Sequence, residues 1–309
     1  MLKDKKLRFR KNVIFCVFYC LFCLFFPFLL QINKTCLAMP FYDLQPQELV
    51  LRAEFFTSYS TSSPERKHNI MLASKSLNNL LVAPHEEFSF NKTVGARTEK
   101  RGYKTAKIIV NGEFADGIGG GVCQVSTTLY NALLLAGMKI LEFHPHSLAV
   151  SYVSPSFDAM VNSGWADLKF INTTHNPVLI KTFTDDASIR IQIFGQPMDV
   201  KYIRKSVVTQ DIPAPDYEKV VDDKGEFPDL YEGENRIIKY SKAGLESEGY
   251  LITSKDGKVI KVRKIRSDKY APIRGKIILG TAIKPNLEQA EILPTIECLS
   301  MLKEKIYIC

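Results

Sequence analysis

The sequence lacks the short motifs that mark nucleotide-, metal- and repeat-based functions. Its glycine-rich stretch at residues 117–121 has no Gly-Lys-Ser/Thr ending and no six-residue dinucleotide fingerprint, which argues against a nucleotide site. Outside an apolar N-terminal run it has no Cys-x-x-Cys pair, so a thiolate zinc site is not expected. It also has no internal repeats and no low-complexity tract, which argues against a solenoid or a long disordered linker.

Excess positive charge is scarce once the first twelve residues are set aside. The formal net charge is +8, and residues 1–12 hold six basic groups against one acidic group, which leaves +3 for the remainder. The alkaline pI therefore gives no argument for nucleic acid, and no nucleic-acid partner is expected. The basic cluster precedes an almost uninterrupted apolar run at residues 13–32, which is long enough to span a bilayer.

This N-terminal arrangement predicts the compartment of the rest of the chain. A basic flank before one apolar span predicts a cytoplasmic N-terminus and an external body held at the cell membrane. The alternative is a cleaved signal peptide with secretion to the cell wall, because Leu37-Ala38-Met39 offers a small residue for cleavage.

The cysteines lie almost entirely in the terminal segments. Six of the seven are placed there: Cys16, Cys20, Cys23, Cys36, Cys298 and Cys309. We interpret those within the apolar run as apolar fillers, and the last two could form a bridge outside the cytoplasm. The seventh, Cys123, stands alone inside a folded-domain pattern, which in an exported protein marks a candidate reactive thiol.

The sequence is organised around residues 117–132, where a glycine-rich loop runs into a helix. Four glycines in five positions predict a loop whose backbone closely approaches another group. Apolar residues then recur at helical spacing, which predicts a helix over residues 123–136 that ends near Gly137. Cys123 would begin this helix, where unpaired N–H groups and the helix dipole favour a thiolate. A buried, purely structural cysteine is the alternative interpretation.

Residues 119–131 read Gly-Gly-Gly-Val-Cys-Gln-Val-Ser-Thr-Thr-Leu-Tyr-Asn, and other short words surround them. These words are Glu-Phe-Ser-Phe-Asn at 87–91, Val94-Gly95, Gly102-Tyr103, His-Pro-His-Ser at 144–147, Tyr152-Val153, Asp158-Ala159 and Asp-Leu-Lys-Phe at 167–170. Together they resemble the VanW family of Gram-positive cell-envelope proteins. That family was first named for an accessory role beside glycopeptide (vancomycin) resistance. Its members look like cysteine-dependent L,D-transpeptidases of peptidoglycan, with a fold distinct from the better-known L,D-transpeptidases.

The resemblance implies an acyl-transfer site with Cys123 as the nucleophile. Two histidines two residues apart on an extended chain point to opposite sides, so only one can face the thiol. The family word favours His146 as the base, with Asp158 as the acid that orients it and His144 in a supporting role. The residues expected to hold an oxyanion or the substrate are Gly119, Gly120, Gly121, Gln124, Ser126, Thr127, His144 and Ser147.

Other interpretations of these residues remain open at the level of the sequence. The hydroxyls of Ser126 and Thr127 could instead cap the first turn of the helix, and Asp158 could be a buried acid bonded to backbone. His144 and His146 could form the metal pair of a hydrolase, although no third ligand is evident nearby. No metal and no cofactor are therefore expected. The chain departs from the family pattern at Glu142-Phe143, where many relatives have an arginine, and at Ser156-Phe157, where the family has a glycine.

We expect an α+β fold, in which a VanW-type domain has one central helix packed on antiparallel strands. A small extended all-β module follows that domain, and an N-terminal membrane helix precedes it. The expected divisions are 1–40 for the basic tip with its anchor or signal peptide, 41–197 for the VanW-like domain, 198–285 for the β module and 286–309 for the tail.

Local patterns predict the elements within these divisions. Strands are expected at 54–61, 104–110, 138–142, 167–172, 178–183 and 188–194. Ser63-Pro64 starts a helix that would run to Pro84 and bury a stripe made of Ile70, Ala73, Leu77, Leu80 and Leu81. Lys-Asp-Gly-Lys at 255–258 predicts a hairpin turn between strands at 250–253 and 259–265. This module resembles the G-five domain of wall proteins, which is thought to bind polymer containing N-acetylglucosamine or to act as a spacer.

The expected function is that of a cysteine-dependent L,D-transpeptidase, which joins the third residues of two stem peptides through a thioester intermediate. Its expected partners are peptidoglycan stem peptides and glycan strands, with the membrane as a further contact of the N-terminal segment. The alternative is a non-catalytic wall-binding or glycopeptide-resistance accessory protein in which Cys123 is structural.

Overall fold

The computed structural model describes residues 49–110 and 112–284. This part of the chain is mostly β-strand with few helices. The membrane helix expected at residues 13–32 and the tail expected at 286–309 lie outside the described residues. None of the helices in the described part is long and apolar enough to cross a membrane.

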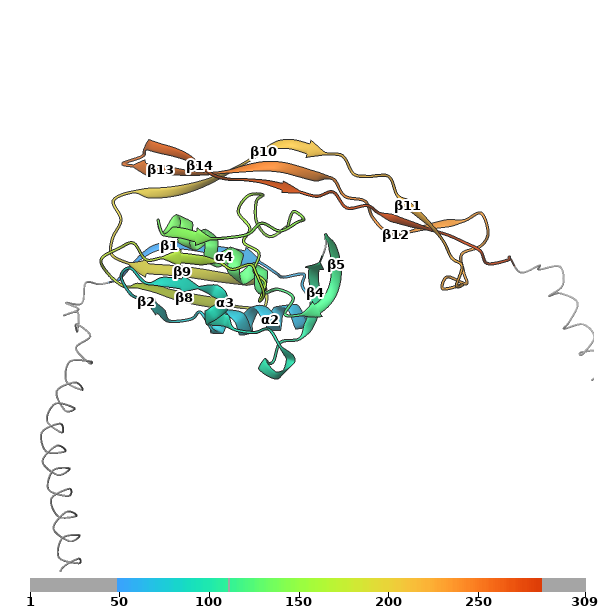
Figure 1. Cartoon of the computed structure of the whole chain (residues 1–309), viewed down its shortest axis with the longest axis horizontal. Coiled ribbons are helices and arrows are strands. Elements are labelled where there is room, and N and C mark those ends of the chain that lie inside the picture. Colours follow the sequence, from blue (N-terminus) through green and yellow to red (C-terminus); the bar gives the residue numbers. More distant parts are fainter. Residues whose placement is uncertain (1–48, 111, 285–309) are drawn as a thin grey trace, which may run out of the picture. The chain divides into compact units, whose positions relative to one another are not determined.

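The first sheet carries the central helix. Its four antiparallel strands follow the order β1-β9-β8-β2, and they span Val50–Ser58, Ser188–Gly195, Val178–Thr184 and Leu80–Val82. Ile189, Ile191 and Ile193 on β9 are all fully buried, as their alternation with polar residues predicts. Helix α4 (Val122–Leu135) packs against β1 and β9 of this sheet (Figure 1).

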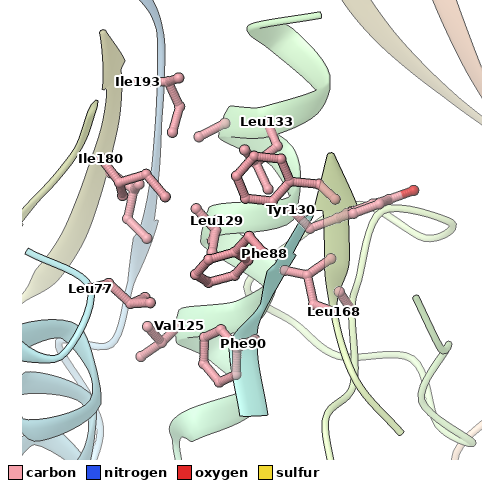
Figure 2. Close-up of a cluster of buried hydrophobic side chains, with 14 of the residues drawn as sticks. Leu77, Phe88, Phe90, Val125, Leu129, Tyr130, Leu133, Leu168, Ile180 and Ile193 are labelled. Atoms are coloured by element: carbon pink, nitrogen blue, oxygen red, sulfur yellow. The ribbon is translucent and has the colours of Figure 1, made fainter. Parts of the chain in front are cut away.

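Helix α4 is buried along nearly its whole length, and its buried residues include polar ones whose side chains bond to the protein as well as apolar ones that face the core. Leu129 and Leu133 on α4 lie among Ile180, Ile193 and the ring of Phe88 (Figure 2). Each fully buried side chain of this kind contributes about 1.5–3 kcal/mol relative to an exposed one. The start of α4, where Cys123 lies, is therefore held by the core of the domain.

Short elements surround this core and lead into the site. Sheet β3-β7-β6 consists of Glu87–Ser89, Lys169–Ile171 and Lys139–Glu142. The hairpin β4 (Thr105–Val110) and β5 (Glu113–Ile118) ends directly at the glycine loop. Helix α2 (Pro64–Lys75) packs against α4, and α3 (Phe90–Val94) and a 3-10 helix (Glu99–Arg101) lie between α2 and the hairpin in the sequence.

The C-terminal part of the described chain is entirely β. One sheet has the order β10-β13-β14, with strands Lys201–Ile212, Gly244–Lys255 and Lys258–Tyr270. The other has the order β11-β15-β12, with strands Glu218–Val221, Lys276–Leu279 and Asn235–Lys239. The turn predicted at 255–258 is confirmed: Lys255 pairs with Lys258, and Asp256 and Gly257 have φ angles of +50° and +77°, which a tight hairpin turn requires.

Several elements differ from the expectation, and the strands expected at 250–253 and 259–265 are longer, spanning Gly244–Lys255 and Lys258–Tyr270. The helix that starts at Pro64 ends at Lys75 rather than near Pro84. The N–H groups of residues 76–78 bond to oxygens three positions back, and Asn79 then takes a left-handed φ of +59°, so the chain turns away from the helix. Leu80 and Leu81, expected on the helical stripe, instead pair with β8 as part of β2. The first strand is Val50–Ser58 rather than 54–61, because the chain turns at Tyr59, whose carbonyl accepts from the N–H of Ser62. Helix α3 was not expected.

Candidate active site

The glycine loop holds the start of α4 against the β4-β5 hairpin. A Cβ atom at Gly120 would lie 2.6 Å from the main-chain oxygen of Lys107, so only glycine fits. Gly121 is the N-cap of α4 with a φ of +109°, and it has no side chain to cap the helix. Val122 and Gln124 donate their N–H groups to oxygens of the loop, at 3.2 Å and 2.9 Å. The N–H of Cys123 lies between them, at the positive end of the helix.

Cys123, His146 and Asp158 form one connected group at this helix end. Cys123 is a free cysteine and a partly exposed residue, and its Sγ donates to the main-chain oxygen of Val161 at 3.4 Å. The ring of His146 lies close enough to the same sulfur for its hydrogen bond and charge to act on the pKa of the thiol. The other side of that ring faces the acid, with His146 Nδ1 2.7 Å from Asp158 Oδ2. The main-chain N–H of His146 donates to the same oxygen at 2.6 Å. His146 is therefore held by Asp158 at two points, and its second ring nitrogen is left for the thiol.

Burial and charge act in opposite directions on the two ionisable partners. Burial acts to raise the pKa of the Cys123 thiol, but the hydrogen bond and charge of His146, together with the charge of Arg97, lower this pKa below its ordinary value. Burial likewise acts to lower the pKa of His146, but its bonds to Asp158 and Cys123 raise it to about 9. At neutral pH these shifts favour an imidazolium beside a thiolate.

The second carboxylate oxygen of Asp158 is bound by two residues of the sheet β10-β13-β14. Tyr270 on β14 donates its hydroxyl to Asp158 Oδ1 at 2.6 Å, and Arg266 Nη2 lies 3.2 Å from the same oxygen. Sequence reasoning missed both residues, because they stand more than a hundred positions from Asp158 and belong to a segment without a chemical motif. The sequence left open whether Asp158 orients His146 or is a buried acid bonded to backbone. In the structure its carboxylate does both, because it contacts the ring of His146 and accepts from the main-chain N–H of the same residue.

Three of the residues expected to touch substrate are buried and bonded to the protein. Gln124 Nε2 donates to Ser58 O at 2.8 Å, and Ser126 Oγ donates to Ala159 O at 2.5 Å. Thr127 Oγ1 accepts from the N–H of Ala159 at 2.9 Å. Ser126 and Thr127 thus hold the residue that follows Asp158, while Gln124 ties the start of α4 to the end of β1. The structure gives these side chains supporting positions instead of substrate-facing ones.

His144 and Ser147 contact other groups than the thiol. His144 Nε2 is 3.0 Å from Glu142 Oε1, and its ring meets Trp165 edge to face with centroids 5.4 Å apart. Ser147 is exposed, and its main-chain oxygen accepts from the N–H of Ala271 at 2.8 Å. The two histidines therefore point to different partners, as alternation along an extended chain predicts.

Two arginines that sequence reasoning missed flank the glycine loop. Arg66 on α2 packs against Gly121 and donates to Gln124 Oε1 at 2.8 Å. Arg97 packs against Gly119 and donates to neutral oxygens of Asn91 and Ser163 at 2.7 Å and 2.9 Å. Within the described part of the chain neither forms an ion pair with a carboxylate. Their positive charges lie beside Cys123 and favour its thiolate.

Comparison with known proteins matches the part of the chain that carries this site to a family. The family described as "VanW like protein" matches residues 65–194. The uncharacterized protein YoaR of Bacillus subtilis (strain 168) is 41% identical over 152 residues, which cover 49% of this chain and 50% of that protein. The vancomycin B-type resistance protein VanW of Enterococcus faecalis (strain ATCC 700802 / V583) is 32% identical over 154 residues, which cover 45% of this chain and 56% of that protein. The chain thus spans about half the length of the curated relatives it matches.

Two solved G5 domains are also similar to part of the chain. The IgA1 protease G5 domain has 22% identity and a TM-score of 0.19, and the match covers 27% of this chain and 90% of that one. The domain HP0197-G5 has 17% identity and a TM-score of 0.15, and the match covers 27% of this chain and all of that one. At these TM-scores the likeness carries no argument, so the G-five-like character of the module stays a prediction. The match to residues 65–194 includes the glycine loop, Cys123, His146 and Asp158, so this part of the chain is a VanW-like domain.

Proposed function

We propose that this protein is a cysteine-dependent acyltransferase that acts on peptidoglycan stem peptides as an L,D-transpeptidase. The observation that carries the proposal is the connected group Cys123–His146–Asp158 at the start of a buried helix. A thiolate at the positive end of a helix is a nucleophile, and a histidine oriented by a carboxylate can move the protons that acyl transfer requires.

The first step is an acylation. The thiolate of Cys123 attacks the carbonyl carbon between the third stem residue and the terminal D-residue, so a C–S bond forms. Main-chain N–H groups of Gly120, Gly121 or Cys123 hold the developing oxyanion. The C–N bond then breaks, and the imidazolium of His146 gives its proton to the leaving amine. The products are a thioester and a free D-amino acid.

The second step transfers the acyl group. The amine of another stem peptide attacks the thioester, His146 takes its proton, and the C–S bond breaks to return the thiolate. The new amide joins the third residues of two stems. Water in place of the amine would give an L,D-carboxypeptidase by the same path.

The arginines beside the loop fit an anionic donor. The terminal residue of a stem peptide carries a free carboxylate close to the amide that is cleaved. Arg66 and Arg97 offer two guanidinium groups whose charges act on the thiol, each bonded only to neutral side-chain oxygens in the described part of the chain. A guanidinium can bind a carboxylate through two parallel hydrogen bonds, which would fix the donor amide against Cys123.

The N-terminal sequence supports a proposed location for this protein, and the proposed function names its partners. We propose that the segment at residues 13–32 holds the protein at the cell membrane, or is cleaved on export, so that the site faces the wall. Stem peptides are the proposed substrates, and glycan strands are the proposed ligand of residues 198–285.

The proposal is tested by intact mass spectrometry of the full-length protein after incubation with tetrapeptide muropeptides. We expect a covalent adduct on Cys123 with loss of the terminal D-residue, followed by a muropeptide dimer. Cys123→Ala removes both, whereas Cys298→Ala, a matched change at another cysteine, leaves them intact. If wild type and Cys123→Ala give the same products, the enzymatic proposal fails.

A non-catalytic role is the second candidate. It is favoured by the relative in Enterococcus faecalis, whose name records vancomycin resistance and no reaction. In this case Cys123 would be structural, and Cys123→Ala would bind wall fragments as wild type does while neither protein forms an adduct.

A further inference from the structure

Strand β14 supplies half of the contacts of the Asp158 carboxylate. The Tyr270 hydroxyl donates to Oδ1 at 2.6 Å, and Arg266 Nη2 lies 3.2 Å from the same atom. Arg266 Nη1 also donates to the main-chain oxygen of Asp158 at 2.6 Å. Asp158 and Tyr270 are both 1% exposed. A carboxylate this enclosed stays charged only where donors surround it, so these contacts bear on its ionisation as well as its position.

The sheet that contains β14 packs closely on the segment before Asp158. The N–H of Ser156 donates to the Tyr270 hydroxyl at 2.7 Å, and the Ser156 hydroxyl lies 2.7 Å from that of Ser247 on β13. A Cβ atom at Gly249 would lie 2.8 Å from Ser156 O, so the backbones touch there. Ser206 on β10 donates to Pro155 O at 2.7 Å. All three strands of the sheet therefore contact this one segment.

The guanidinium of Arg266 is held in its orientation by further groups. Its Nε lies 2.6 Å from Asp268 Oδ2. Its central carbon lies 4.7 Å from the ring centre of Phe143 and 5.8 Å from that of Tyr130. Phe143 belongs to the segment that leads to His146, so Arg266 contacts both sides of the His146–Asp158 pair.

We infer that β14 is part of the candidate active site, and that Tyr270 and Arg266 are positioning residues that hold Asp158 and, through it, the ring of His146 against Cys123. The inference rests on the proposed function in taking His146 as the partner of the thiol. Residues 198–285, expected to be a wall-binding module or a spacer, then also complete the site in residues 65–194.

The physical consequence concerns the charge of Asp158. Without its donors on β14, burial keeps Asp158 protonated to a higher pH, and a neutral acid cannot hold an imidazolium. Because the imidazolium is then less stable, the pKa of the Cys123 thiol rises, and its thiolate forms only at a higher pH. The ionisable groups that interact with Asp158 come from α4, from residues 143–161 and from β14, and they are Tyr130, His146, Tyr152, Arg266 and Tyr270. Cys123 and Asp268 act on two of these groups, His146 and Arg266.

The test is the rate at which iodoacetamide alkylates Cys123 in the full-length protein between pH 4 and 10, followed by mass spectrometry on the Cys123 peptide. We expect Arg266→Gln and Tyr270→Phe each to move the acid limb of this profile upward, with at least a threefold lower rate at pH 6. Arg204→Gln is the matched control. Arg204 on β10 also joins the sheet to α4, through Asn131 at 2.5 Å, but makes no contact with Asp158. Its profile should match that of wild type.

Three results would overturn the inference. These are an unchanged profile in both β14 variants, a shift toward lower pH, or an equal shift in Arg204→Gln. The last result would mean that packing of the sheet against the domain is enough to determine the pKa of the Cys123 thiol. Tyr270→Phe keeps the ring and so tests the inference even where Arg266→Gln does not fold. Alkylation needs no stem peptide, so a shifted profile in a protein that forms no muropeptide adduct would support the inference while the proposed function fails.

Discussion

Replacing Asp158 with asparagine tests how the candidate site is held. Asp158 Oδ2 accepts from the N–H of His146 and faces its Nδ1, while Oδ1 accepts from Tyr270 and Arg266. An asparagine of the same size has one side-chain oxygen and one NH2 group. Whichever way the amide is turned, its NH2 group faces donors on one side. The change therefore leaves buried donors unpaired and removes the negative charge between His146 and Arg266.

The magnitude follows from the partners that remain. Removing one partner of a buried ion pair costs about 3–5 kcal/mol. Asp268 still lies 2.6 Å from Arg266 Nε, so we expect the lower end of that range, about 3 kcal/mol. With an m value of about 3 kcal/mol per M in urea, the unfolding midpoint would fall by about 1 M. The control is Asp116→Asn on β5, whose exposed ion pair with Lys107 should cost less than about 1 kcal/mol.

The pH dependence of this loss has a definite sign. Burial acts to raise the pKa of Asp158, but its bonds to His146, Arg266 and Tyr270 lower it below the ordinary value. The stability from this group is therefore present above the unfolded pKa of about 3.9 and is lost as the pH falls through the lower folded pKa. The gap between wild type and Asp158→Asn should close below about pH 4, and it should also narrow as the pH rises from about 6.5 through 9, where His146 loses the proton that Asp158 helps it to hold. Equal urea midpoints for the two proteins at pH 7 would refute this account of the site.

Three further predictions address the chemistry and the loop. Arg97→Gln should raise KM for a stem peptide about tenfold or more with a smaller change in kcat, because a hydrogen bond to a charged group is worth about 1.5–3 kcal/mol; an unchanged KM would exclude Arg97 from the substrate site. Gly120→Ala should destabilise the fold by about 1–3 kcal/mol in thermal unfolding, because its Cβ would lie 2.6 Å from Lys107 O. The control Gly164→Ala should be nearly neutral, because its Cβ would lie 3.4 Å from Asn162 Oδ1. Acylation by substrate should fall above pH about 9, where His146 loses the proton it gives to the leaving amine, while alkylation by iodoacetamide should not fall.

The sequence predicted the elements whose burial repeats with a fixed period. Helix α4 was expected at 123–136 and spans Val122–Leu135, and the alternating isoleucines of β9 are buried as expected. Helix α2 was extended too far in the prediction, because apolar spacing continues through Leu80 and Leu81 while the chain has already turned at Asn79. Periodicity reports which face is apolar and does not register a single left-handed residue.

The candidate site was predicted unevenly for a related reason. Cys123, His146 and Asp158 stand in specific short words, and the structure brings all three together. Gln124, Ser126 and Thr127 stand in the same words, yet their side chains are buried against the protein. A motif records that a residue type is required at a position, and both chemistry and packing can impose that requirement.

By itself the sequence determined the local features of this protein: the close turn at the glycine loop, the helix whose first turn holds Cys123 and the turn at 255–258. These features depend on the backbone freedom of glycine and on the spacing of apolar residues, which are both properties of residues close together in the sequence. Only the tertiary structure decided which side chains surround the thiol. Arg97 precedes the β4-β5 hairpin in the sequence and packs against the loop that follows it, and Tyr270 and Arg266 reach Asp158 from β14. The physical reason is that a buried charge takes its partners from whatever packs against it, however far away along the chain those partners lie.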